Sequence, residues 1–133
     1  MRIELTRRGD YAVRAMIELA RPGAGKQTSA ALAATTAIPG SFLPQVMGDL
    51  VRAGLVENVR GRHGGYRLAR DAGEVSLLAV VEAVEGDGRR QSCVLRGGPC
   101  GRDGTCDVHD AFFRAQEALF GTLAGVSLSD VAR

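Results

Sequence analysis

SAALAATTAIPGSFLPQVMGDLVRAGLVENVRGRHGGYRLA, residues 29–69, determines which fold we expect for this chain of 133 residues. Its first part predicts a short helix over residues 30–36, and the Ile-Pro-Gly sequence at 38–40 predicts a turn. Ser41 is suited to cap a second helix that runs to about Ala53, because its hydroxyl can accept a hydrogen bond from an unpaired backbone amide. Two short helices joined by a tight turn are therefore expected.

A β-hairpin is expected directly after these helices. Residues 55–60 and 66–69 each have the short, apolar-rich pattern of a strand, and the glycine-rich segment 61–65 lies between them. Helix, helix and hairpin in this order are typical of a winged helix-turn-helix domain. In such domains the second helix of the motif lies in the major groove of DNA.

Helical patterns flank this region on both sides. Residues 10–20 predict a helix before it, and residues 77–85 and 106–123 predict two helices after it, of which the last is long. The expected fold class is mainly α with a small β-hairpin wing. We expect a DNA-binding head over 1–75 and a C-terminal part over 76–133 that holds the cysteines and the long helix.

The candidate DNA contacts lie at the start of the second helix of the motif and on the hairpin. They are Ser41, Phe42, Gln45, Arg60, Arg62 and His63. The amide of Gln45 can form two hydrogen bonds with adenine, and arginine at a hairpin tip suits the narrow, negative minor groove. Each residue alone could be an ordinary surface residue. Their order along the chain favours a contact surface for double-stranded DNA.

The charge distribution agrees with a polyanionic partner. The net charge is +2, but residues 1–75 hold 11 Arg or Lys against 7 Asp or Glu, whereas residues 76–133 hold 6 against 8. A basic N-terminal half favours DNA as the partner. No apolar run is long enough for a membrane span, and the N-terminus lacks the apolar stretch of a signal peptide. We therefore expect no membrane association and a cytoplasmic location.

Three cysteines, Cys93, Cys100 and Cys106, lie within one 14-residue stretch. An odd number of cysteines in a cytoplasmic chain argues against a disulfide framework. Thiolates suit iron–sulfur clusters and zinc, although the closely spaced cysteine pairs typical of structural zinc sites are absent. From the residues alone, metal or cluster binding, thiol redox sensing and coincidence stay open as alternatives.

Three blocks of sequence resemble the IscR/NsrR family of winged-helix regulators. They are Thr6-Arg-Arg-Gly-Asp-Tyr-Ala-Val-Arg-Ala-Met, Leu43-Pro-Gln-Val-Met-Gly-Asp-Leu-Val-Arg-Ala-Gly-Leu-Val and Val59-Arg-Gly-Arg-His-Gly-Gly-Tyr-Arg-Leu-Ala. The last block is the most specific, since it matches the family's wing of Val-Arg-Gly, a short spacer and Gly-Gly-Tyr/Val-x-Leu. The resemblance covers nearly the whole chain. It implies a homodimer that pairs through the long C-terminal helix and binds palindromic DNA operators.

The resemblance also implies an iron–sulfur cluster, 2Fe–2S or 4Fe–4S, held by Cys93, Cys100 and Cys106. In IscR-like members the fourth ligand is a histidine three residues after the third cysteine, where this chain has His109. In NsrR-like members it is an aspartate near the N-terminus of the partner subunit, which matches Asp10. Both candidates are present, so the sequence does not choose between them. Such a cluster would sense redox state, iron or nitric oxide and modulate operator binding.

The chain departs from the family pattern at a few positions. Pro44 stands where IscR-like members have Glu, and Ala37 stands where the turn often has Gly. The gap between the first two cysteines is one residue longer than in the IscR form. These differences leave the cluster type and the operator sequence open.

Other functions fit the sequence less well. The chain could be a winged-helix regulator without a cluster that uses its three cysteines as zinc ligands or redox thiols. It could also be an adaptor whose head contacts only proteins. An enzyme is not expected, because the chain has two histidines and no combination of nucleophile and base that would indicate catalysis.

Overall fold

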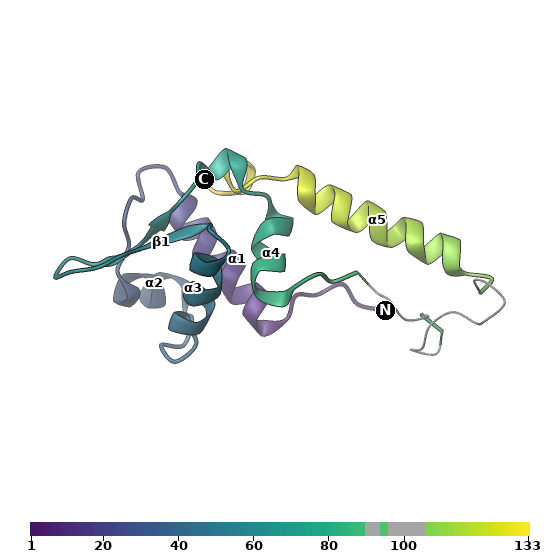
Figure 1. Ribbon diagram of the computed structural model, residues 1–133, viewed down its shortest axis with the longest axis horizontal. Helices are drawn as coiled ribbons and strands as arrows, with labels where there is room; N and C mark the ends of the chain where they lie inside the picture. The colour runs from purple at the N-terminus through teal and green to yellow at the C-terminus, as the bar shows by residue number, and fades with distance from the viewer. Residues whose placement is uncertain (90–93, 96–105) are drawn as a thin grey trace.

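The computed structural model describes residues 1–89, 94–95 and 106–133, so Cys93 and Cys100 lie outside the described residues. Its helices are α1 (Arg7–Ala20), α2 (Ser29–Thr36), α3 (Leu43–Arg52), α4 (Leu77–Glu85), α5 (His109–Gly125) and α6 (Leu128–Val131), with a 3₁₀ helix, η1 (Ala72–Glu74). Strands β1 (Val56–Val59) and β2 (Gly65–Leu68) form an antiparallel hairpin that projects from the helices (Figure 1). The predicted fold class, mainly α with a small hairpin, is confirmed.

Threonine and serine hydroxyls determine where several helices begin. Thr6 accepts a hydrogen bond from the backbone N–H of Gly9 at 3.1 Å and so caps α1, while Ser76 caps α4 as predicted. The prediction that the first helix begins at Asp10 is wrong. Because Thr6 provides the cap, the helix begins at Arg7, and Asp10 lies inside its first turn.

Two later helices, α3 and α5, begin after their predicted starts. Phe42 is the N-cap of α3 and makes no side-chain capping bond, so the prediction that Ser41 caps this helix is wrong. The reason is that the turn continues to Phe42, whose N–H donates to the carbonyl of Pro39 at 2.9 Å. α5 begins at His109, because the chain first makes a turn in which the His109 N–H donates to the Cys106 carbonyl at 3.0 Å.

One apolar core joins helices from both parts of the chain. Its largest fully buried side chains are Met16, Leu32, Leu43, Met47, Leu50, Leu128, Val46, Val75 and Val80. Val80 of α4 and Leu128 of α6 thus share a core with Met16 of α1. Both the start and the end of the C-terminal part are therefore attached to the head by apolar packing. The division into 1–75 and 76–133 stays a prediction.

α5 extends from this core and is attached at its C-terminal end (Figure 1). The Leu77 N–H donates to the Val126 carbonyl at 2.9 Å, and the Leu128 N–H donates to the Val75 carbonyl at 2.9 Å. No residue of α5 is buried, and Phe113 is 52% exposed. α5 thus displays apolar side chains that the described part of the chain does not cover.

Within the described ranges, no helix is long and apolar enough to cross a membrane.

The turn between α2 and α3 contains a strained backbone position. Ala37 ends α2 with φ 58° and ψ 24°, in the left-handed region. A side chain with a Cβ adopts this region at a cost of about 1–2 kcal/mol, whereas glycine adopts it readily. The turn therefore carries a local strain at Ala37.

We predict that Ala37→Gly raises the free energy of unfolding by about 1 kcal/mol, because it relieves this strain. The exposed Ala34 inside α2 offers a matched control. Ala34→Gly should lower the same free energy by about 0.5–1 kcal/mol, since glycine is unfavourable inside a helix. Urea unfolding followed by circular dichroism measures both. Shifts in the same direction for the two variants would show that Ala37 is not strained.

Candidate nucleic-acid interface and cysteine site

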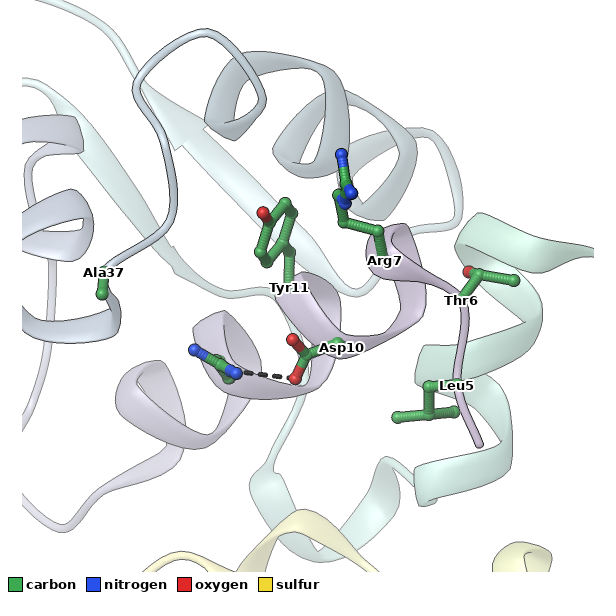
Figure 2. Close-up of a pocket in the computed structure, with 7 residues that line it drawn as sticks. Leu5, Thr6, Arg7, Asp10, Tyr11 and Ala37 are labelled. Carbon is green, nitrogen blue, oxygen red and sulfur yellow. Dashed lines mark hydrogen bonds and ion pairs between the residues drawn. The ribbon is translucent and has the colours of Figure 1, made fainter. Parts of the chain in front are cut away.

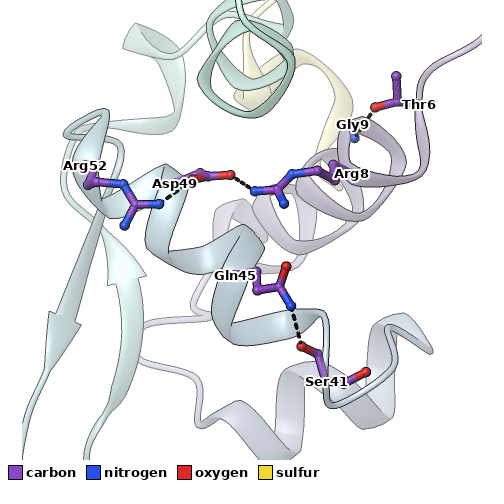
Figure 3. Close-up of polar contacts among 7 residues, drawn as sticks. All are labelled: Thr6, Arg8, Gly9, Ser41, Gln45, Asp49 and Arg52. Atoms are coloured by element: carbon purple, nitrogen blue, oxygen red, sulfur yellow. Dashed lines mark hydrogen bonds and ion pairs between the residues drawn. The ribbon is translucent and has the colours of Figure 1, made fainter.

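The first group of predicted DNA contacts lies in the turn before α3 and in the first turn of that helix. Gln45 is exposed, and its Nε2 donates to the Ser41 carbonyl at 3.2 Å (Figure 3). Phe42 is half-buried: its ring centroid lies 5.6 Å from that of Tyr11, and the Arg7 guanidinium lies 6.0 Å from the Phe42 ring centroid. Phe42 therefore packs α3 against α1, while Ser41 and Gln45 are accessible. Contact of all three with DNA stays a prediction.

Asp49 joins α3 to α1 through two arginines that were not among the predicted site residues. Its carboxylate bonds the guanidinium of Arg8, from the first turn of α1, and that of Arg52, one turn further along α3 (Figure 3). Burial raises the pKa of Asp49, but the hydrogen bonds from the two guanidiniums outweigh burial and lower the pKa below its ordinary value of 3.8. Asp49 is therefore ionised at neutral pH.

Of the two ion pairs, Asp49–Arg52 could be predicted from the sequence and Arg8–Asp49 could not. Asp49 and Arg52 are three residues apart on a predicted helix, a spacing that places them on neighbouring turns. That spacing is a signal from which this pair could have been found. Arg8 is separated from Asp49 by 41 residues, and no local pattern connects them. Only the packing of α1 on α3 brings these two side chains together.

Close backbone contact fixes the direction of the hairpin. Gln27 and Tyr66 exchange two backbone hydrogen bonds, at 2.8 and 2.7 Å. A Cβ on Gly65 would lie 2.3 Å from the carbonyl oxygen of Gln27, so this approach requires glycine. Across the two strands, the Arg67 Nε lies 2.7 Å from a carboxylate oxygen of Glu57. The Gly-Gly-Tyr sequence of the wing thus has a structural reason, which is attachment of β2 to the segment before α2.

The remaining predicted DNA contacts lie at the far end of this hairpin. Arg60, Arg62 and His63 are all exposed. Gly61 has φ +112°, a backbone conformation that side chains with a Cβ rarely adopt, and so permits the turn between them. Figure 1 shows the hairpin end lying away from the helices. The guanidiniums of Arg60 and Arg62 therefore lie at the end of the hairpin, away from the helices, where a nucleic-acid groove could receive them.

An open hollow of about 530 Å³ lies beside the first turn of α1 (Figure 2). Its lining residues are Leu5, Thr6, Arg7, Asp10, Tyr11, Arg14 and Ala37. The Arg14 Nε donates to Asp10 Oδ1 at 2.9 Å, and the Arg14 Nη1 donates to the Thr36 carbonyl at 3.5 Å. Asp10 is thus a part-exposed carboxylate on the head that is paired with Arg14.

Cys106 and His109 are the candidate ligands at the other end of the molecule. They are three residues apart at the start of α5, and the His109 ring stacks on that of Phe113 with 6.0 Å between centroids. Figure 1 shows this end of α5 well away from α1, so Asp10 of the same chain does not lie beside them. A thiolate and an imidazole at this spacing are donors that fit an iron–sulfur cluster or zinc.

Comparison with known proteins gives one consistent result. A sequence profile of the Rrf2 family, described as an iron-dependent transcriptional regulator, matches residues 5–133. The chain is 33% identical over 132 residues to Protein aau3 of Rhizobium meliloti (strain 1021), with 98% of this chain and 86% of that protein covered. It is 34% identical over 130 residues to the HTH-type transcriptional regulator IscR of Citrobacter koseri, with 97% and 79% covered.

Solved structures agree with these sequence matches. CymR, the global cysteine regulator of B. subtilis, superposes with a TM-score of 0.82 at 26% identity, covering 98% of this chain and 97% of that one. IscR of T. potens superposes with a TM-score of 0.75 at 25% identity, covering 97% and 85%. Each similarity extends over nearly all of this chain. The Rrf2 profile, IscR and CymR are all described as regulators, in agreement with the prediction that this chain is not an enzyme.

We predict that Gly65→Ala lowers the free energy of unfolding by about 1–3 kcal/mol, because its Cβ would overlap the Gln27 carbonyl and force the backbone to shift. Gly40→Ala is the matched control, since nothing lies within 4 Å of the position of its Cβ. This control should change the free energy of unfolding by less than about 0.5 kcal/mol. Chemical unfolding of both variants measures the difference, and equal values would contradict the close approach of Gly65 to Gln27.

Proposed function

Because this chain belongs to the Rrf2 family of transcriptional regulators, we propose that it acts as a homodimer whose binding to a DNA operator is modulated by an iron–sulfur cluster. The observation that carries the proposal is the accessible polar face of α3 beside a projecting, arginine-bearing hairpin. These are the two elements with which winged helix-turn-helix domains contact duplex DNA.

The two elements would contact different grooves. Ser41 lies in the turn just before α3 and Gln45 in its first turn, and the start of a recognition helix is the part that meets base edges in the major groove. Arg60, Arg62 and His63 would enter the adjacent minor groove, where arginine is favoured by the negative potential. Phe42 would support this arrangement, since it packs the start of α3 against α1.

The homodimer is supported by the surface of α5. Phe112 is 39% exposed and Phe113 is 52% exposed on a helix that has no buried residue. Exposed aromatic rings on a long helix are typical of an interface between protein chains. Pairing through α5 would place two heads on one DNA duplex, as a palindromic operator requires.

The proposed cluster ligands are Cys93, Cys100 and Cys106, with a fourth ligand from His109 or from Asp10 of the partner subunit. When bound, an iron–sulfur cluster supplies a centre that exchanges electrons and reacts with small molecules. Cys106 would hold the cluster just before α5. His109, three residues later, is the first residue of that helix. Asp10 would have to exchange its ion pair with Arg14 for ligation, because Arg14 lies 2.9 Å from its carboxylate.

A second candidate mechanism has its own support. CymR superposes well on this chain and is described as a global cysteine regulator, and CymR of Staphylococcus aureus has been solved in an oxidized form. In this alternative, Cys93, Cys100 and Cys106 would act as redox thiols or zinc ligands. The DNA-binding part of the proposal is the same in both cases.

We predict that protein purified without oxygen shows visible absorption and contains both iron and acid-labile sulfide. Cys106→Ala should lose most of the iron, because a thiolate ligand is removed. The chain's two histidines offer a matched pair. If His109 is the fourth ligand, His109→Ala should alter the spectrum, whereas His63→Ala on the hairpin should leave it unchanged. If Asp10 is the ligand, Asp10→Ala should alter it instead.

The same samples test whether the cluster modulates DNA binding. We expect holo and apo protein to differ at least tenfold in operator affinity, which corresponds to about 1.4 kcal/mol. Equal affinities would contradict modulation by a cluster. A colourless protein that cannot be reconstituted, with iron and sulfide absent, would contradict the cluster itself and favour the thiol or zinc mechanism.

A further inference from the structure

The outer face of α3 contains a negative charge where DNA would approach. With 3.6 residues per turn, Gln45, Gly48 and Arg52 follow one line along the helix, and Asp49 lies at its edge toward α1. An unpaired carboxylate at this position would repel the phosphates of DNA. Here the carboxylate is bonded on two sides by guanidiniums, one from each helix.

A phosphate contact requires the two arginines to be more exposed to solvent than the carboxylate that they bond, and this is what the structure shows. The Asp49 side chain is 18% exposed, whereas that of Arg8 is 40% exposed and that of Arg52 is 73% exposed. Figure 3 shows the carboxylate between the two guanidiniums. The cluster of these three residues carries a net charge of +1, with its negative group innermost. A ligand that approaches from solvent therefore meets the positive groups first.

Gly48 leaves the space that the Arg52 guanidinium occupies. A Cβ at Gly48 would lie 3.3 Å from Arg52 Nη1, closer than an ordinary van der Waals contact. The long arginine side chain can therefore turn back over the outer face of α3 to reach Asp49. This conformation places the guanidinium on the same line as Gln45. An arginine that extended freely into solvent would lose more side-chain entropy on binding DNA.

We propose that Arg8 and Arg52 bind backbone phosphates of duplex DNA, and that Asp49 is a positioning residue that holds both guanidiniums at the face of α3. The inference rests on the proposed DNA-binding function and adds three residues to it. A guanidinium has five N–H donors, so each arginine keeps donors for a phosphate oxygen after it bonds Asp49. Because phosphate contacts do not depend on base sequence, these residues would set the strength and register of binding on any duplex.

The salt dependence of binding tests the two arginines. The probe is a mixed-sequence DNA duplex, titrated with the full chain at several salt concentrations by fluorescence anisotropy. Each lost phosphate contact should reduce the slope of log K against log salt by about 0.9, which weakens binding about eightfold at 0.1 M salt. We expect this change for Arg8→Gln and for Arg52→Gln. Arg21→Gln is the control of equal charge, since Arg21 pairs with Glu18 at the other end of α1.

The Asp49→Asn variant tests the positioning role, because repulsion of DNA by this carboxylate and positioning of the arginines by it predict opposite changes in DNA affinity. If Asp49 only repels DNA, removing its charge should tighten binding. If it positions the arginines, Asp49→Asn should weaken binding severalfold, and it should add little in an Arg8→Gln/Arg52→Gln background. Thermal melting of each variant identifies loss of folding. Should Asp49→Asn fail to fold, the slopes of the two arginine variants still decide the assignment of phosphate contacts.

The possible failures are distinguishable. Wild-type protein that does not bind the duplex at any salt concentration would overturn the proposed DNA-binding function, whereas binding without salt dependence would overturn the phosphate contacts. Wild-type protein that binds with a steep salt dependence, while Arg8→Gln and Arg52→Gln match Arg21→Gln in slope, would overturn the phosphate contacts alone. Tighter binding by a folded Asp49→Asn variant would overturn the positioning role.

Discussion

The packing of α3 against α1 is the constraint on which the rest of the molecule depends. Val46, Met47 and Leu50 are fully buried on one side of α3, and this burial fixes the opposite side toward solvent. A rotation of the helix by half a turn would bury Gln45 and expose Leu50. The apolar half of this short helix therefore determines which polar groups are available for recognition. The Arg8–Asp49 ion pair then ties the two helices together at their outer edge.

A second attachment sets the hairpin relative to α3. The bridge between Gln27 and Tyr66, permitted by Gly65, holds β2 against the segment that precedes α2. α3 and the hairpin are thus fixed to the same small core by independent contacts. The N-terminus of α1 is also tied to the end of α4, where the backbone N–H of Thr6 lies 3.3 Å from a carboxylate oxygen of Glu85. Glu85 is the last residue of α4, so this bond lies close in sequence to the cysteine-bearing stretch.

Local patterns in the sequence predict most of the fold. Helical spacing, Pro-Gly turns and the glycine-rich hairpin indicate the order of the elements, and Ser76 correctly marks the start of α4. Two of the errors fall where local signals compete: α1 begins at Arg7, after the Thr6 cap, and not at Asp10, and the turn after Pro39 moves the N-cap of α3 from Ser41 to Phe42. Both starts are set by short-range hydrogen bonds from backbone N–H groups, Gly9 N–H to the Thr6 hydroxyl and Phe42 N–H to the Pro39 carbonyl, and several residues near each start could have served as the cap.

The candidate site is less predictable than the fold, because its contacts join distant residues. Gln45 and the hairpin arginines follow from position in the motif, whereas the approach of Arg8 to Asp49 spans 41 residues and depends on helix packing. For Phe42 the DNA contact predicted from its place in the motif stays a prediction, and its packing against the Tyr11 ring was not predicted.

Selection of bound sequences from a random pool of DNA duplexes would test the central claim most directly. The full chain should be used both as purified without oxygen and after removal of any bound metal. A homodimeric winged-helix regulator should enrich an inverted repeat whose half-sites are centred about 10 base pairs apart, or a multiple of that spacing. Enrichment of such a repeat by at least one of the two forms is the predicted result. A pool that stays unchanged after selection with both forms would contradict sequence-specific DNA binding by this chain.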